Sequence, residues 1–260
     1  MVPRTLAEML HPEAAFYNKR LAATTIREFT ADADPKVSGF LHLPELLNND
    51  GMVLTHGAGG NARAPLLITL AEAFCAEGFA VLRCNLPFRQ LRSWGPPGPG
   101  DAMRDRAGLR NAVAALRKEI SGRIFLGGHS YGGRQASMLC AEEPELVSGL
   151  LLLSYPLHPP RKPEQQRTQH LPDLRTPALF VHGTRDPFGS VPELEQAIKM
   201  IPGKTKLLAV EGAGHDLGFK GKAKRAELPP GILRAFQSFF AGASRSFSHR
   251  EPGESETSSS

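Results

Sequence analysis

Short apolar runs alternate along the chain with longer segments in which apolar side chains recur at helical spacing. The runs have the length and composition of buried strands and occupy residues 51–56, 79–82, 123–127, 147–153, 177–182 and 205–210. Helical spacing is found in residues 65–78, 101–120, 134–140, 191–200 and 228–240. Residues 24–30 and 37–43 predict an opening hairpin. This order predicts an α/β fold with a mostly parallel central sheet and helices on both faces.

One domain, residues 21–240, accounts for most of this pattern. Residues 1–20 precede it as a short amphipathic helix or an irregular arm. Residues 241–260 are rich in Ser, Glu, Pro and Gly, which predicts a disordered tail because this composition offers little apolar surface to bury. Inside the domain, residues 85–100 predict a long loop rich in Pro and Gly, and Asp101 is the expected N-cap of the helix that follows.

The sequence Gly-His-Ser-Tyr-Gly at residues 128–132 lies between a predicted strand and a predicted helix. Gly-x-Ser-x-Gly at such a junction is typical of a nucleophile elbow, a sharp turn that presents a serine hydroxyl. Ser130 is therefore the candidate nucleophile. We expect a side chain at Gly128 or Gly132 to collide with the tight turn. The alternative is a glycine-rich connection with an ordinary serine, since short motifs also occur by chance.

An acid and a base follow the elbow, each directly after a predicted strand. Asp186 stands in Gly-Thr-Arg-Asp-Pro, and His215 stands in Gly-Ala-Gly-His-Asp. A serine hydroxyl needs a histidine base and an acid that orients it, and Ser, Asp, His is the order expected for an α/β-hydrolase triad. Asp216 and Glu211 are rival acids, although Asp216 is poorly placed to reach the far ring nitrogen of its neighbour. Each residue alone also fits an ordinary turn.

The backbone N–H groups of Ala58 and Tyr131 are the candidates for an oxyanion hole. Ala58 lies in a glycine-rich loop after the first predicted core strand. The same loop offers an alternative function, because Gly57, Gly59 and Ala62 match a dinucleotide-binding fingerprint. The acidic residue that would bind the ribose is missing at the end of the next predicted strand, so we expect no nicotinamide cofactor.

Four further residues follow predicted strand ends and are candidates for lining the pocket: Asn85, Arg89, Trp94 and His158. Structural roles compete with this interpretation. Asn85 and His158 could satisfy backbone groups of their loops, and Trp94 could anchor its loop.

The charge of the chain gives little indication of a macromolecular partner. The formal net charge is +5, from 31 basic and 26 acidic residues, without an arginine-rich block or zinc-finger spacing, so nucleic-acid binding is not predicted. Residues 83–134, however, hold ten Arg or Lys against three Asp or Glu. If these basic side chains line the site, they would favour anionic substrates. The alternative places them on solvated helix and loop faces.

Cysteine usage and hydropathy favour an intracellular location. Cys75, Cys84 and Cys140 lie in apolar contexts and form neither a disulfide framework nor a metal motif. Residues 1–20 lack an apolar stretch of signal-peptide length, and no segment reaches the roughly 20 apolar residues that span a bilayer. We expect a cytoplasmic protein that uses no membrane, metal or cofactor. The sequence carries no signal for an oligomeric state.

Several blocks of sequence together resemble a known group of proteins. The blocks are Leu-Thr-His-Gly-Ala-Gly-Gly at 54–60, Arg-x-Asn-x-Pro at 83–87, Gly-Gly-His-Ser-Tyr-Gly-Gly-Arg at 127–134, Tyr-Pro-Leu-His-Pro-Pro at 155–160 and Gly-Thr-Arg-Asp at 183–186. Over about residues 37–240, the chain resembles the dienelactone-hydrolase-related branch of the α/β-hydrolase superfamily, which includes a testis-expressed protein and a chromatin-complex subunit.

This resemblance implies the α/β-hydrolase fold and a Ser-Asp-His arrangement on Ser130, Asp186 and His215. Dienelactone hydrolases proper carry a cysteine nucleophile, so Ser130 argues against dienelactone itself as the substrate. The sequence thus predicts a serine hydrolase that cleaves an ester, thioester or similar small acyl substrate. Some members of the branch serve as scaffold subunits, so the alternative is a non-catalytic binding or scaffold module on the hydrolase fold.

Overall fold

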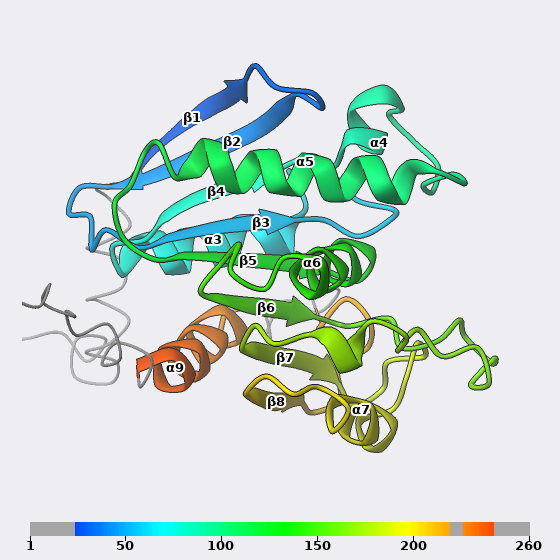
Figure 1. The fold of residues 1–260 in the computed structure, drawn as a ribbon. Helices are drawn as coiled ribbons and strands as arrows, with labels where there is room; N and C mark the ends of the chain where they lie inside the picture. The colour runs from blue at the N-terminus through cyan, green and yellow to red at the C-terminus, as the bar shows by residue number, and fades with distance from the viewer. Residues whose placement is uncertain (1–23, 219–225, 242–260) are drawn as a thin grey trace, which may run out of the picture.

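The computed structural model describes residues 24–218 and 226–241, whose arrangement is shown in Figure 1. The predicted arm at residues 1–20 lies outside the described residues. The predicted tail at residues 241–260 also lies outside them, except for its first residue.

The described strands form one sheet in the order β1-β2-β4-β3-β5-β6-β7-β8. Their bounds are Thr24–Ala31 (β1), Val37–Pro44 (β2), Gly51–Thr55 (β3), Ala80–Cys84 (β4), Ile124–His129 (β5), Gly149–Leu153 (β6), Ala178–Gly183 (β7) and Thr205–Val210 (β8). The β1–β2 hairpin is antiparallel and forms one edge, β2 pairs antiparallel with β4, and the remaining pairs are parallel. The predicted mostly parallel sheet is confirmed.

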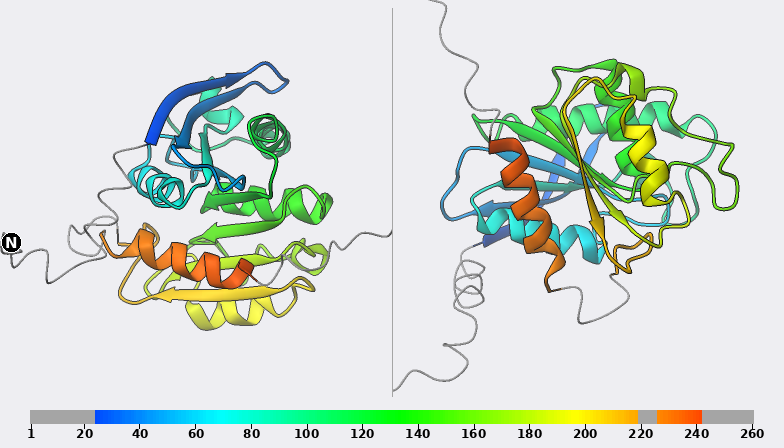
Figure 2. Two further views of the ribbon diagram at one scale, coloured as in Figure 1. Left: turned by 90° about the vertical axis from the view of Figure 1, so that its left-hand side faces the viewer. Right: turned by 90° about the horizontal axis from the view of Figure 1, so that it is seen from below.

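Helices cover both faces of this sheet (Figure 2). One face carries α3 (Pro65–Ala76) and α9 (Leu228–Phe240), and the other carries α5 (Asp101–Leu116), α6 (Tyr131–Glu142) and α7 (Val191–Ile198). Successive strand residues point to opposite faces, so both must be apolar. In β3, Met52 and Leu54 pack with α3 and α9, whereas Val53 packs with α5. None of the described helices is long and apolar enough to cross a membrane.

The segment between β4 and α5 differs from the expected long loop. It contains a short helix, α4 (Pro87–Leu91), which begins with a proline, the residue that suits a first helical position. The following helix starts at Asp101, but its N-cap is Gly100, with a left-handed φ of 87°. The Asp101 carboxylate instead accepts a hydrogen bond from the Gly98 backbone N–H at 2.6 Å. Asp101 is therefore the first helical residue, and its expected role as the N-cap was wrong.

Candidate active site

A cavity of about 660 Å³ opens at the carboxyl edge of the parallel strands. The loops that follow β3, β5, β7 and β8 all contribute to it, because parallel strands end at the same edge of a sheet. Ser130 and His215 line the cavity beside an apolar wall formed by Pro65, Leu66, Leu67, Pro156 and Phe188. Its volume suits a small organic ligand.

Ser130 occupies a strained turn between β5 and α6. Its φ of 51° and ψ of −117° lie outside the conformations that residues with side chains usually adopt. An added Cβ at Gly128 would lie 2.5 Å from the Gly132 carbonyl carbon, and one at Gly132 would lie 2.4 Å from the His56 carbonyl oxygen. The expected collisions are confirmed. The two glycines thus allow α6 to begin immediately after the strand, with Ser130 at the cavity.

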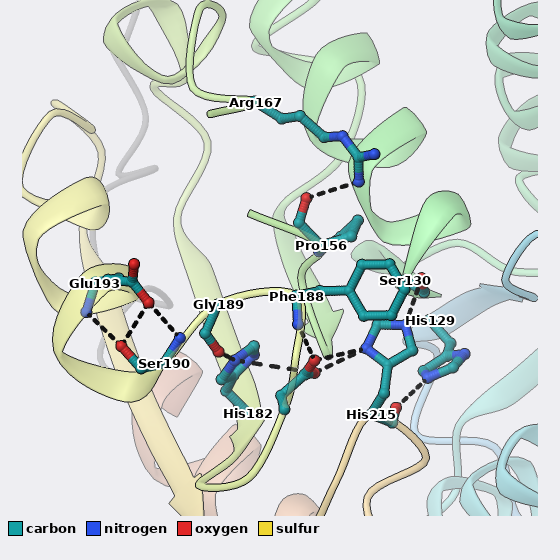
Figure 3. A network of polar contacts seen from close by, with 11 residues as sticks. His129, Ser130, Pro156, Arg167, His182, Phe188, Gly189, Ser190, Glu193 and His215 are labelled. Atoms are coloured by element: carbon teal, nitrogen blue, oxygen red, sulfur yellow. Dashed lines mark hydrogen bonds and ion pairs between the residues drawn. The ribbon is translucent and has the colours of Figure 1, made fainter. Parts of the chain in front are cut away.

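Ser130, His215 and Asp186 are joined by a continuous chain of hydrogen bonds (Figure 3). Nε2 of His215 lies 2.8 Å from Oγ of Ser130, and its Nδ1 lies 2.8 Å from Oδ2 of Asp186. A carboxylate can only accept, so Nδ1 carries the proton and Nε2 is free to accept the serine hydroxyl proton. This is the tautomer that a general base requires.

The Asp186 side chain is fully buried at the carboxyl end of β7. Its Oδ1 accepts a hydrogen bond from the Phe188 backbone N–H at 2.9 Å, which fixes the carboxylate in its turn. His182 approaches Oδ2 at 3.9 Å, while its Nε2 donates to the Gly189 carbonyl oxygen at 2.8 Å. A fixed, dry carboxylate can hold the His215 ring in one orientation.

Two aromatic neighbours hold the His215 loop against the elbow. The Phe188 ring lies over the His215 ring, with 4.2 Å between centroids and 31° between planes. His129, the residue before Ser130, donates from Nε2 to the His215 backbone carbonyl at 2.8 Å. Burial lowers the pKa of His129 to about 4. His129 is therefore neutral at pH 7 and fixes the base loop without adding charge.

The two rival acids do not reach the Nδ1 atom of His215. Asp216 uses Oδ1 to accept the Gly218 backbone N–H at 3.1 Å. Glu211 accepts only a long contact of 3.5 Å from the Thr184 hydroxyl. Among the described carboxylates, only Asp186 contacts the ring of His215.

Both proposed oxyanion residues line the cavity beside Ser130. The Ala58 loop is held from behind by Arg89, which donates to the carbonyl oxygens of Ala58 and Gly60 at 2.8 Å each. On the other side, the Tyr131 hydroxyl donates to the buried Asp105 carboxylate at 2.7 Å. The side chains thus fix the backbone of both segments, leaving their N–H groups as the candidate donors.

The four residues that we expected to line the pocket are absent from the described lining of this cavity. Asn85 accepts the Ala62 backbone N–H, Arg89 binds carbonyl oxygens, and His158 is buried with Nδ1 on the Pro159 carbonyl oxygen. Trp94 is 83% exposed on its loop. The polar side chains are used by the loop backbone, as the structural alternative supposed.

Two arginines that the sequence did not single out do line the cavity: Arg134 of α6 and Arg167 of the loop after β6. Arg134 lies in the first turn of the helix that begins directly after Ser130, so its closeness to the motif in sequence was the available signal. Arg167 lies in a long loop, and Phe188 lies two residues after Asp186 in the short segment between β7 and α7; no local pattern indicates the position of either side chain. Most other basic side chains of residues 83–134 bind carboxylates or backbone carbonyl oxygens.

Within the described part of the chain, no group of three or more His, Cys, Asp or Glu side chains is placed to hold a metal ion. The cavity instead presents the hydroxyl of Ser130 and the imidazole of His215.

A family model described as an alpha/beta hydrolase domain matches residues 48–229. The chain belongs to this alpha/beta hydrolase family. The matched segment contains the elbow and the loops that carry Asp186 and His215.

Solved structures share the fold at low sequence identity. A dienelactone hydrolase from Anabaena variabilis is 20% identical, with a TM-score of 0.65 over 85% of this chain and 98% of its own. An alpha-beta serine hydrolase homologue from Coxiella burnetii is 19% identical, with a TM-score of 0.62 over 80% and 96%. Est1E from Butyrivibrio proteoclasticus is 16% identical, with a TM-score of 0.63 over 82% and 99%. These similarities show a common fold.

Proposed function

We propose that the protein is a serine hydrolase that cleaves an ester, thioester or similar small acyl substrate through a covalent acyl-enzyme. The observation that carries the proposal is the unbroken hydrogen-bonded chain from Ser130 through His215 to Asp186, which ends at a cavity of about 660 Å³. The family supports it, because α/β hydrolases present a nucleophile at this turn.

In the first half of the proposed reaction, Ser130 Oγ attacks the acyl carbon while His215 Nε2 takes its proton. The backbone N–H groups of Ala58 and Tyr131 stabilise the oxyanion that develops on the carbonyl oxygen. His215 then gives the proton to the leaving oxygen or sulfur atom, and the acyl group stays on Ser130. Asp186 holds the ring and stabilises its positive charge.

In the second half, a water molecule replaces the leaving group. His215 removes a proton from the water as it attacks the acyl carbon, and the bond to Ser130 Oγ breaks with return of that proton to the serine. The products are a carboxylic acid and free enzyme, and no oxidant or other co-reactant is needed.

A fluorophosphonate probe tests the proposed nucleophile, because it reacts with activated serine hydroxyls. We expect the purified protein to be labelled and Ser130→Ala to take no label. Ser93→Ala, which removes an exposed hydroxyl outside the cavity lining, is the matched control and should label as the wild type does. Circular dichroism establishes that all three proteins are folded.

Equal labelling of wild type and Ser130→Ala would refute the assignment of the nucleophile. A folded wild-type protein that takes no label and cleaves no ester or thioester would instead indicate the alternative, a non-catalytic binding module on the same fold.

A further inference from the structure

Arg134 and Arg167 line the same cavity as Ser130. The Arg134 backbone N–H donates to the Ser130 carbonyl oxygen at 3.0 Å in the first turn of α6. Arg134 therefore lies in the first turn of α6, directly after the elbow that holds Ser130. Arg167 comes from the loop above Pro156 and reaches toward the space near Ser130 and Phe188 (Figure 3).

Within the described part of the chain, neither arginine forms an ion pair with a carboxylate. Nε of Arg134 is buried and has no hydrogen-bond partner there. Among the described residues, the Arg167 guanidinium group donates one hydrogen bond, from Nη1 to the Pro156 carbonyl oxygen at 3.2 Å. This contrasts with Arg110 and Arg123, whose guanidinium groups bind Glu143 and Asp50.

The two positive charges also act on each other. Burial lowers the pKa of Arg167, and the charge of Arg134 adds to this effect. The same charge contributes to lowering the pKa of His170, after burial, to about 4. Asp216 is the one acidic residue in the described lining; its Oδ1 accepts the Gly218 backbone N–H, and its Oδ2 is buried without a hydrogen-bond partner among the described residues. An anion bound between the arginines would relieve their repulsion and accept hydrogen bonds from their guanidinium groups.

We propose that the substrate carries an anionic group, a carboxylate or a phosphate, at the end of an apolar acyl chain, and that Arg134 and Arg167 bind this group while Ser130 attacks the acyl carbon. The apolar wall of Leu66, Leu67 and Phe188 suits the chain between the two ends. This assignment rests on the proposed hydrolase function and specifies its substrate class.

Three 4-nitrophenyl esters of equal chain length test the assignment: the neutral hexanoate, the adipate half-ester with a terminal carboxylate, and the 5-phosphonopentanoate. After correction for spontaneous hydrolysis, we expect a higher kcat/KM for at least one anionic ester than for the hexanoate. The preference should fall as ionic strength rises, because salt screens charges at an open cavity. The anionic ester with the higher kcat/KM identifies the group that the site binds.

The ratio of kcat/KM between anionic and neutral ester is the readout for the variants. Arg134→Gln and Arg167→Gln should each lower this ratio about tenfold or more, as expected for the loss of one charge-assisted hydrogen bond. Arg134→Lys and Arg167→Lys keep the positive charge but lose the planar guanidinium group, so each should retain part of the wild-type preference for the anionic ester. Arg104→Gln removes a charge that pairs with Asp34 outside the cavity lining, and should leave the ratio unchanged.

Folding of each variant is established by its thermal unfolding curve. A wild-type protein that takes the fluorophosphonate label but hydrolyses all three esters alike overturns the anion site and leaves the hydrolase function standing. The anion site is likewise overturned, with the hydrolase function left standing, if Arg134→Gln and Arg167→Gln both retain the wild-type preference for anionic esters. A wild type that takes no label and hydrolyses none of the esters overturns both proposals.

Discussion

In the proposed mechanism, Asp186 determines which ring nitrogen of His215 carries the proton. Its carboxylate can only accept, so it selects the tautomer of His215 in which Nε2 can receive the serine proton. An asparagine would keep the shape of the side chain, but its NH₂ group could face Nδ1 and favour the opposite tautomer. His215 would still be present in Asp186→Asn, but its Nε2 would no longer be free to accept the serine proton.

Asp186→Asn should therefore lower kcat for ester hydrolysis by about 10⁴, the loss seen in the best-studied triad. Steady-state kinetics on a 4-nitrophenyl ester measure this loss. Asp216→Asn is the matched control, because it neutralises the neighbouring carboxylate and keeps an oxygen for the Gly218 N–H. A large loss in Asp216→Asn together with a small loss in Asp186→Asn would contradict the assignment of the acid.

At the scale of single residues, local motifs predicted three residues that the structure brings into contact: Ser130, Asp186 and His215. They could do so because each residue stands in the segment that follows the carboxyl end of a strand, where the fold leaves few possible positions. Arg167 could not be predicted, since a long loop brings it to the cavity, and Phe188 could not because no motif marks the direction of its side chain. Asn85 and His158 are polar and follow strands, yet their side chains bind nearby backbone groups.

At the scale of elements, the elbow depends on the close approach of α6 to the loop after β3. Gly132→Ala would set a Cβ 2.4 Å from the His56 carbonyl oxygen, so the first turn of α6 must move. We expect a loss of about 1–3 kcal/mol in the free energy of unfolding, the usual cost of overpacking, together with loss of fluorophosphonate labelling. Urea denaturation and the probe measure the two effects.

Gly231→Ala in α9 is the matched glycine control. A Cβ there meets nothing within 4 Å among the described residues, and alanine favours a helix over glycine by roughly 0.5–1 kcal/mol. This variant should be at least as stable as the wild type and label normally. A Gly132→Ala protein with wild-type stability and labelling would show that the tight contact is not required.

The apolar periodicity predicted the core strands and longer helices because burial on both sheet faces imposes a strong pattern. The apolar periodicity did not predict the short elements. The α4 helix and the single turn η1 (Leu171–Asp173) contain too few residues for a helical period to show. Pro87 at the start of α4 was the available signal. Strands of the sheet and helices packed on it can thus be predicted from the apolar pattern, whereas short helices within loops cannot.

At the scale of the whole molecule, buried neutral histidines link the stability of the fold to pH. His42 and His56 are at most 1% exposed, and burial lowers the pKa of each from 6.5 to about 4. His42 Nε2 accepts a hydrogen bond from Arg83 Nε, and His56 Nε2 accepts one from the Leu86 backbone N–H. Protonation of Nε2 in either histidine would remove the acceptor of that hydrogen bond.

Between pH 6.5 and pH 4 the unfolded chain therefore binds more protons than the folded chain. The free energy of unfolding should fall as the pH decreases through this window, by on the order of 1 kcal/mol per pH unit for each such histidine, and should be insensitive to these groups above pH 6.5. Urea denaturation at pH 7.5, 6.5 and 5.5 measures the slope. His42→Gln, which offers Arg83 an amide oxygen and cannot titrate, should reduce the slope. Equal stability at all three pH values, or an unchanged slope in the variant, would contradict the role of the buried rings.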